Sequence, residues 1–321
     1  MDGMRLGVID VGSNTVHLLV VDAYHPGAHP MPDYSHSTVL RLSEHLTDGG
    51  DISDEGARRL SGFVGECVDV AEERGVKQLM GFATSAIREA GNTEAVLARV
   101  KDASGVSLDV LDGDAEARVT FLAARRWFGW SAGRLLLIDI GGGSLELAAG
   151  LDEAPDVAVS LPLGAGRLTR ELTKDPPGAD EIKAIRKRVR SEIASVQPRL
   201  ARVGEPQLAV GTSKTIRSLA RACGAAPRAD GPYVSRTLAL DDLSALVQKL
   251  ATMPAATRAQ LPGVSAARAP QLLAGAVVVE AAMDLLGLET LTVCPWALRE
   301  GLILRFLDSL TGREATNGHR A

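Results

Sequence analysis

One short pattern occurs twice in the chain and limits the folds that it can adopt. An apolar run reaches an Asp and is followed by an apolar residue, by Gly and by small polar residues, first at Asp10-Val-Gly-Ser-Asn-Thr15 and again at Asp139-Ile-Gly-Gly-Gly-Ser144. The two aspartates are 129 residues apart (139 − 10). This spacing is too long for a solenoid repeat and indicates a duplicated domain. A second run follows each turn, at 16–21 and 144–149, so each copy predicts a hairpin.

A length of 321 residues suggests two domains, and the two turns place their boundary near residue 130. We expect one domain over residues 1–130 and another over 131–321, with the last helix, 297–309, packing back on the first. Strands alternate with helical patterns in both halves, which indicates the α/β class. Further strands are expected at 78–83, 107–111, 157–161, 207–210 and 290–293. The main helices are expected at 53–71, 114–128, 182–196 and 270–286, with a loop at 25–36 and a disordered end at 311–321.

Composition narrows the class of protein. Hydrophobic residues make up 45% and charged residues 23%, as in an ordinary globular protein. A net charge of −5 argues against a general nucleic-acid binder. Three scattered cysteines suggest neither a zinc site nor a disulfide framework. The apolar stretch 272–283 is interrupted by Glu280 and is too short to span a bilayer, so we expect a cytoplasmic protein without a membrane partner.

The two turns have the composition of phosphate-binding loops. Glycine lets the backbone approach an anion closely, and successive N–H groups can form an anion-binding nest. Hydroxyl and amide side chains add donors, so the candidate phosphate ligands are Gly12, Ser13, Asn14, Thr15, Gly141, Gly142, Gly143 and Ser144. An Asp beside a bound phosphate would repel it unless a cation lay between them, so Asp10 and Asp139 suggest Mg²⁺. The alternative is a pair of ordinary glycine-rich hairpins.

Three further residues carry weaker signals. Glu146 would share a strand face with Ser144 and could be a second metal ligand, or it could face solvent on an outer strand. Arg88 follows a strand end, where an Arg could clamp a phosphate or lie on a helix surface. Glu116 could be catalytic or could serve only as a partner of the helix dipole in the first turn of its helix.

Two basic features are candidates for anion contacts. Gly211-Thr-Ser-Lys-Thr215 resembles a third phosphate turn at the head of a helix, with Lys214 as its candidate ligand and Arg167 as a further one. The run of Lys and Arg at 183–190 predicts either a solvated helix face or a guide for a polyanion.

One acidic residue lies where burial is expected. Glu280, within an apolar helix, is expected to be paired or at an interface.

Five ordered motifs together resemble a known family. They are Asp10-Val-Gly-Ser-Asn-Thr15, Ala83-Thr-Ser-Ala-Ile-Arg88, Gly113-Asp-Ala-Glu-Ala-Arg118, Asp139-Ile-Gly-Gly-Gly-Ser-Leu-Glu146 and Leu298-Arg-Glu-Gly301. The chain resembles the exopolyphosphatase/guanosine pentaphosphate phosphatase (Ppx/GppA) family over about residues 5–308, and is most similar to its short actinobacterial exopolyphosphatases. That family belongs to the actin–hexokinase–Hsp70 superfamily. The resemblance implies two ribonuclease H-like domains with the active site in a cleft between them.

The resemblance also assigns roles. It implies that Glu116 is the general base on the attacking water and that Arg88 holds the terminal phosphate. Asp139 and Glu146 are implied as ligands of Mg²⁺ or Mn²⁺, and K⁺ is an additional cofactor candidate. The implied substrate is inorganic polyphosphate, with (p)ppGpp as another substrate or an inhibitor, and a homodimer is expected.

The chain departs from the family pattern in three places. Glu116 is the only Glu of its motif, where many members have an acidic run. Cys294-Pro-Trp-Ala297 stands where many members have Ser-x-x-Gly, so that loop is expected to differ. The sequence carries no C-terminal helical domain of the kind found in long members, so we expect a preference for short chains.

Four functional hypotheses follow from these observations. The first is release of terminal phosphate from polyphosphate, and the second is the same reaction on guanosine pentaphosphate. The third is a kinase or chaperone-type ATPase on the same fold, which would transfer the phosphoryl group to an acceptor other than water. The fourth is a non-catalytic sensor of polyphosphate or the alarmone.

Overall fold

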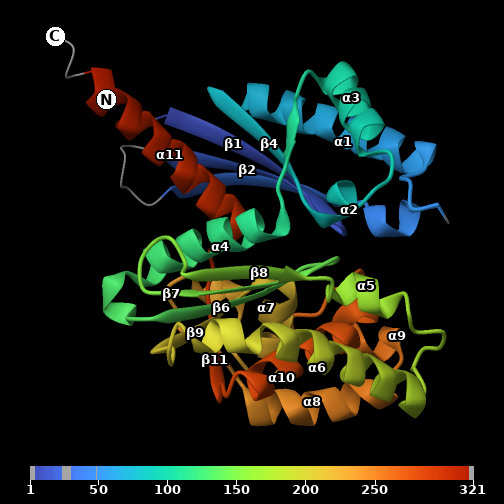
Figure 1. Cartoon of the computed structure of the whole chain (residues 1–321). Coiled ribbons are helices and arrows are strands. Elements are labelled where there is room, and N and C mark those ends of the chain that lie inside the picture. Colours follow the sequence, from blue (N-terminus) through green and yellow to red (C-terminus); the bar gives the residue numbers. More distant parts are fainter. Residues whose placement is uncertain (1–3, 24–29, 48, 318–321) are drawn as a thin grey trace. The chain divides into compact units, whose positions relative to one another are not determined.

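The computed structural model describes residues 4–23, 30–47 and 49–317. The chain divides into two compact units, Met1–Asp112 with Leu298–Ala321, and Gly113–Ala297 (Figure 1). The division follows Asp112, whereas the sequence pattern placed it near residue 130. The helix at 113–128 therefore belongs to the second unit, and the last helix belongs to the first.

The first unit is built on a five-stranded sheet with the order β3-β2-β1-β4-β5. The strands β1, β2 and β3 are antiparallel neighbours, and β4 and β5 continue the sheet in parallel on the other side of β1. The strands are β1 (Met4–Val11), β2 (Thr15–Ala23), β3 (Met31–Val39), β4 (Gln78–Ala83) and β5 (Leu108–Val110). The helices are α1 (Asp54–Glu73), α2 (Ser85–Arg88), α3 (Thr93–Ser104) and α11 (Leu298–Asn317).

The two faces of β1 have different roles. Ile9 and Val11 belong to the buried core that also contains the apolar stripe of α1. Because side chains alternate along a strand, Asp10 projects to the opposite face. The helix α11 packs against β1. Ser53 is the N-cap of α1, since its side chain accepts a hydrogen bond from the backbone N–H of Gly56 at 3.2 Å.

The second unit repeats this topology with one added edge strand. Its sheet has the order β10-β11-β9-β6-β7-β8, with β6, β7 and β8 antiparallel and β9 and β11 parallel to β6. The strands are β6 (Leu135–Ile140), β7 (Leu145–Gly150), β8 (Val157–Leu161), β9 (Leu208–Thr212), β10 (Thr237–Ala239) and β11 (Thr290–Val293). The helices are α4 (Gly113–Phe128), α5 (Ala165–Thr169), α6 (Ala179–Ala201), α7 (Ser213–Ala222), α8 (Leu240–Thr252), α9 (Ala255–Arg258) and α10 (Leu272–Leu285).

Helices cover both faces of the second sheet (Figure 1). Leu136, Ile138 and Ile140 of β6 join the large core that contains the apolar residues of α6, α8 and α10. The alternate β6 side chains, including Asp139, project to the other face, where α4 packs against β6, β7 and β8. This arrangement places α4, which carries Glu116, over the sheet face that carries Asp139.

Several elements differ from the sequence-based expectation. Residues 31–39, expected in part as loop, form β3, an edge strand whose side chains are mostly polar and partly exposed. An edge strand buries little apolar surface, so the alternation that predicts strands is weak there. The strand β10 and the helix α8 were also not predicted. The helix α11 continues to Asn317, so helix covers 311–317, where disorder was expected, and 318–321 lie outside the described residues.

Arg125 connects α4 to the start of the second sheet. Its side chain is buried and donates to the carbonyl oxygens of Gly129 at 3.2 Å, Gly133 at 2.7 Å and Gly150 at 3.2 Å. A hydrogen bond from a charged donor contributes about 1.5–3 kcal/mol, and the Gly129 carbonyl keeps a second donor in the Ala132 N–H at 3.4 Å.

We therefore expect Arg125→Met to lower the free energy of unfolding by about 2–4 kcal/mol, because methionine can replace the stem but not the donors. Urea unfolding of the full chain measures this effect. Arg202→Met, at an exposed position of the same unit, is the control and should change stability by less than about 0.5 kcal/mol. Equal stability of the Arg125 variant and the wild type would contradict the assigned role.

Candidate active site

The second glycine turn is held from one side by backbone hydrogen bonds. The N–H groups of Gly164, Ala165 and Arg167, at the start of α5, donate to the carbonyls of Gly143, Gly141 and Gly142 respectively, at 2.9–3.2 Å. The side chain of Arg167 adds a bond from Nε to the carbonyl of Gly143 at 2.9 Å. All three glycine carbonyls therefore point toward α5.

This arrangement determines the direction of the N–H groups. In a trans peptide the carbonyl of one residue and the N–H of the next point in opposite directions. The N–H groups of Gly142, Gly143 and Ser144 must therefore point away from α5. Three successive N–H groups on one side of a turn form an anion-binding nest. Arg167, a candidate phosphate ligand from sequence, contributes here by holding the turn.

Two buried carboxylates lie at the same register beside this turn. Asp139 of β6 is the direct cross-strand partner of Glu146 of β7, and Glu146 is the partner of Ser160 of β8. Side chains of such partners project to the same sheet face. Asp139 is 9% exposed and Glu146 is 1% exposed, so the alternative of a solvent-facing Glu146 is wrong. Ser160 donates its hydroxyl hydrogen to Glu146 Oε1 at 2.8 Å.

The donor set fits a hard divalent cation. Two neighbouring buried carboxylates repel each other, and a cation between them offsets that repulsion. Across the described ranges, no cluster of three or more His, Cys, Asp or Glu side chains could hold a metal. Asp139 and Glu146 are therefore a pair of candidate ligands and not part of a larger cluster of such side chains. A two-carboxylate site suits Mg²⁺, which usually takes its other ligands from water and substrate phosphates.

The first turn is closed in the same way but is attached to different partners. Gly12 N–H donates to the Thr15 carbonyl at 3.0 Å, as Gly141 N–H does to the Ser144 carbonyl at 2.9 Å. The hydroxyl of Ser13 is buried and bonded to that of Ser85, the first residue of α2, at 2.8 Å. The carbonyl of Asn14 accepts from the N–H of Arg41 at 2.9 Å. Both sides of this turn are therefore attached to the rest of the unit.

Asp10 has a charged neighbour that the sequence did not reveal. Asp10 Oδ2 lies 3.9 Å from a guanidinium nitrogen of Arg299, which α11 brings to this face of β1. The same guanidinium contacts Nδ1 of His17, the cross-strand partner of Asp10. Arg299 partly neutralises Asp10 without a metal ion, so metal binding by Asp10 stays a prediction.

His17 also has a polar partner at its other ring nitrogen. Its Nε2 lies 2.6 Å from Ser35 Oγ. His17 follows Asp10 by seven residues, as Glu146 follows Asp139, and this shared spacing is the signal that could have identified His17 from sequence.

The two residues implied as catalytic lie in different units. Arg88 ends α2, its side chain is 21% exposed, and its Nη1 donates to the Leu111 carbonyl at 2.8 Å. It is therefore half-buried and held in place, unlike an ordinary surface arginine. Glu116 is half-buried in the first turn of α4. In the second unit, α4 covers the sheet face that carries Asp139 and Glu146.

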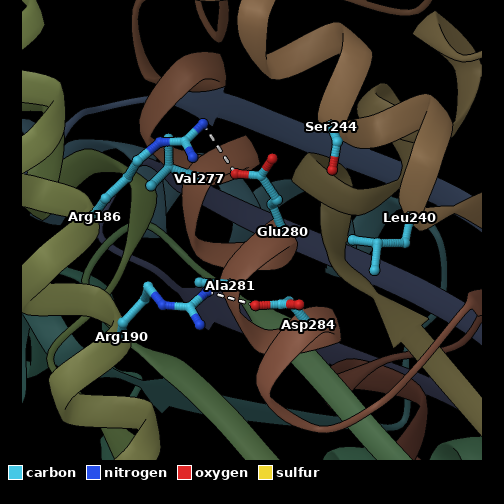
Figure 2. A pocket seen from close by; sticks show the side chains of 8 residues that line it. All are labelled: Arg186, Arg190, Leu240, Ser244, Val277, Glu280, Ala281 and Asp284. Carbon is cyan, nitrogen blue, oxygen red and sulfur yellow. Dashed lines mark hydrogen bonds and ion pairs between the residues drawn. The ribbon is translucent and has the colours of Figure 1, made fainter.

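A separate cavity of about 230 Å³ lies among α6, α8 and α10 (Figure 2). Arg186 and Arg190 of α6 point across it to α10, where they pair with Glu280 at 3.1 Å and Asp284 at 2.6 Å. Arg188 pairs with Glu171. Glu280 is thus paired, as expected. Three of the charges in the 183–190 run are compensated within the unit, which favours a solvated helix face over a polyanion guide.

Two other findings limit the chemistry. None of the three cysteines is in a disulfide, and burial raises the pKa of the Cys67 thiol to about 12 and that of Cys223 to about 11. Neither thiol is therefore a nucleophile near neutral pH. In the part of the chain that the structure describes, no helix is both long and apolar enough to cross a membrane.

The repeated topology and the two Asp-x-Gly turns define a class. This topology and these turns are the features of a two-domain protein of the actin–hexokinase–Hsp70 type, which is built from ribonuclease H-like units. A family model described as "Ppx/GppA phosphatase family" matches residues 21–310. The chain belongs to the Ppx/GppA phosphatase family.

Individual relatives agree with this assignment. Exopolyphosphatase 1 of Mycobacterium leprae is 55% identical over 307 residues, which cover 95% of this chain and 90% of that protein. A guanosine-5'-triphosphate,3'-diphosphate pyrophosphatase of Aliivibrio fischeri is 26% identical over 94% of this chain and 59% of its own length. The crystal structure of an exopolyphosphatase from Cytophaga hutchinsonii has a TM-score of 0.85 at 24% identity, covering 95% of this chain and 98% of that one. This structural likeness confirms the fold.

Gly164 allows the close contact between α5 and the second turn. A Cβ at this position would lie 2.2 Å from Gly143 C and 2.4 Å from Gly143 N and Ser144 N, which are all backbone atoms. We expect Gly164→Ala to lower the free energy of unfolding by about 3 kcal/mol or more, because the turn and α5 must separate. Thermal or urea unfolding measures the change.

The matched control is Gly141→Ala in the turn itself. A Cβ there meets only the Ser144 carbonyl oxygen, at an ordinary 3.6 Å. Its stability should remain within about 0.5 kcal/mol of the wild type. If both variants lost the same stability, close packing at Gly164 would not be the cause.

Proposed function

We propose that this chain is an exopolyphosphatase, which releases terminal orthophosphate from inorganic polyphosphate. The observation that carries the proposal is the second hairpin, where three N–H groups of 142–144 point the same way beside the Asp139–Glu146 pair. One hairpin therefore offers donors for a phosphate and ligands for the cation that accompanies it. The proposal is supported by the Mycobacterium leprae relative named Exopolyphosphatase 1, which is 55% identical to this chain.

The N–H groups of the turn and the two carboxylates have different electrostatic roles. The N–H groups of 142–144 donate to phosphoryl oxygens and stabilise the charge that spreads over them in the transition state. Asp139 and Glu146 would hold Mg²⁺, which when bound offsets the negative charge of the phosphate chain. The turn N–H groups discriminate little among phosphate chains, so the identity of the leaving group is decided elsewhere.

Glu116 and Arg88 supply the remaining roles. Glu116 accepts a proton from water as the water oxygen bonds to the terminal phosphorus and the bridging oxygen departs with the shortened chain. Arg88 donates to the terminal phosphoryl oxygens through its planar set of N–H groups. The reaction needs no covalent phosphoenzyme. Lys214, in the first turn of α7, is an additional phosphate contact.

Guanosine pentaphosphate is the second candidate substrate, because the family also contains the Aliivibrio fischeri relative. That relative is 26% identical, compared with 55% for the exopolyphosphatase, which favours polyphosphate. A kinase on the same fold and a non-catalytic sensor are the alternatives from other classes. A short-chain preference, inhibition by (p)ppGpp, a homodimer and a cytoplasmic location stay predictions.

The decisive variant is Glu116→Gln, which keeps the size of the side chain and removes its basicity. We expect kcat for phosphate release to fall by about 10²–10⁴-fold, with a smaller change in KM. The control is Glu94→Gln, an exposed Glu in the first turn of α3, which should keep its activity. Undiminished turnover by the Glu116 variant would remove it from the role of base.

Substrate choice is measured with the wild type. Orthophosphate release is followed from short polyphosphate, long polyphosphate, guanosine pentaphosphate and ATP, with Mg²⁺ or Mn²⁺ and with or without K⁺. Faster release from short polyphosphate is expected. No release from either polyphosphate would refute the proposed function, and transfer to an acceptor other than water would favour the kinase.

A further inference from the structure

A buried hydroxyl, that of Thr212, lies at the end of β9. Thr212 is the last residue of β9 and is 0% exposed. Its Oγ1 has no hydrogen-bond partner among the described residues. Buried hydroxyls in native proteins are nearly always bonded, so such an exception calls for a functional explanation.

The position of Thr212 in the chain makes this exception more informative. Thr212 is also the N-cap residue of α7, where a threonine normally accepts a hydrogen bond from the first turn of the helix. The Thr212 side chain forms no such bond. Instead, Oγ of Ser213 accepts a hydrogen bond from the N–H of Ile216 at 3.2 Å. Ser213 has a φ of 84°, a region that a residue with a side chain rarely adopts. The chain therefore tolerates strain at Ser213 while the Thr212 hydroxyl is not used as a cap.

Thr212 extends the row of polar residues that crosses the sheet. It is the register partner of Asp139, which is the partner of Glu146, which is the partner of Ser160. Neighbouring strands are about 4.8 Å apart, so each side chain lies beside the next on one face. The two carboxylates occupy the centre of the row, and each has a hydroxyl on its outer side.

The two ends of this row differ in one respect. Ser160 donates to Glu146 at 2.8 Å, which orients that carboxylate. Thr212 occupies the corresponding place beside Asp139, but its hydroxyl is not engaged. Residues that hydrogen-bond to metal ligands orient them and strengthen binding of the ion.

We infer that Thr212 is a positioning residue for Asp139, which accepts the Thr212 hydroxyl hydrogen when a divalent cation is held between Asp139 and Glu146. The inference rests on the proposed function for the presence of that cation. In the cation-free protein the Thr212 hydroxyl makes no hydrogen bond with the described residues, so it does not stabilise the fold. In the loaded protein both carboxylates are oriented by a hydroxyl from the neighbouring strand.

The test uses Thr212→Val, which keeps the shape of the side chain and removes the hydroxyl. The melting temperature of the full chain is measured across a Mg²⁺ titration, with no substrate present. Without Mg²⁺ the variant should melt at or above the wild-type temperature, because an unbonded buried hydroxyl is removed. The Mg²⁺ concentration that gives half of the stabilising shift should rise by about 10–100-fold.

Three matched variants separate positioning from packing. Thr212→Ser should restore the wild-type Mg²⁺ response. Ser160→Ala should weaken the Mg²⁺ response and also lower the melting temperature without Mg²⁺, because Glu146 loses a donor that it already uses. Thr120→Val removes a second buried hydroxyl that has no hydrogen-bond partner in the described part of the chain. It lies on α4, outside the row, and the variant should keep the wild-type Mg²⁺ response.

Several results would overturn the inference. They are a lower melting temperature of Thr212→Val without Mg²⁺, an unchanged Mg²⁺ response of that variant, or an equal loss in Thr120→Val. A wild type that neither Mg²⁺ nor Mn²⁺ stabilises would also overturn it. Because the melting experiment involves no hydrolysis, a wild type that binds Mg²⁺ but releases no phosphate would refute the proposed function alone.

Discussion

The candidate site depends on how the backbone of the second glycine turn is held. Three N–H groups from the start of α5 bind the three glycine carbonyls, and peptide geometry then sends the N–H groups of 142–144 the other way. Glycine at 164 allows this contact, since any Cβ there would collide with the turn. The turn can therefore present donors to an anion without any change of its own. Donors that need no rearrangement stabilise developing charge most effectively.

The duplicated units use one architecture for two different electrostatic arrangements. In each unit an Asp on the central strand faces the residue seven positions later, directly across the hairpin. In the second unit that residue is Glu146, and the pair is acidic and suited to a cation. In the first unit it is His17, and α11 adds Arg299 to the same face. The first turn therefore has a cation beside its Asp, whereas the second has another carboxylate, so the first suits a phosphate cradle more than a metal site.

Charge compensation also decides which basic residues are available to a polyanion. Arg186 and Arg190 of α6 face carboxylates of α10 (Figure 2), and Arg188 pairs with Glu171, so the charge of these three is already used within the unit. Spacing along the sequence could not show the pairs with α10, because Glu280 and Asp284 lie about a hundred residues from Arg186 and Arg190. The backbone N–H groups of 142–144 point away from the α5 contacts, so they offer donors that do not depend on a charged side chain. A protein with a net charge of −5 can therefore bind an anion locally through its main chain.

The sequence by itself determined the α/β class, the two hairpins, the duplicated topology and the family. These follow from local patterns: apolar runs define strands, glycine and small polar residues define turns, and five motifs in a constant order define the relatives. The polar edge strand β3 could not be predicted, because it lacks the apolar alternation that burial imposes on inner strands. Only the tertiary structure showed that Glu146 is buried opposite Asp139, that Arg299 reaches Asp10, and that Thr212 ends the polar row. Strand register and helix packing decide these contacts, and both depend on residues that are distant in the chain.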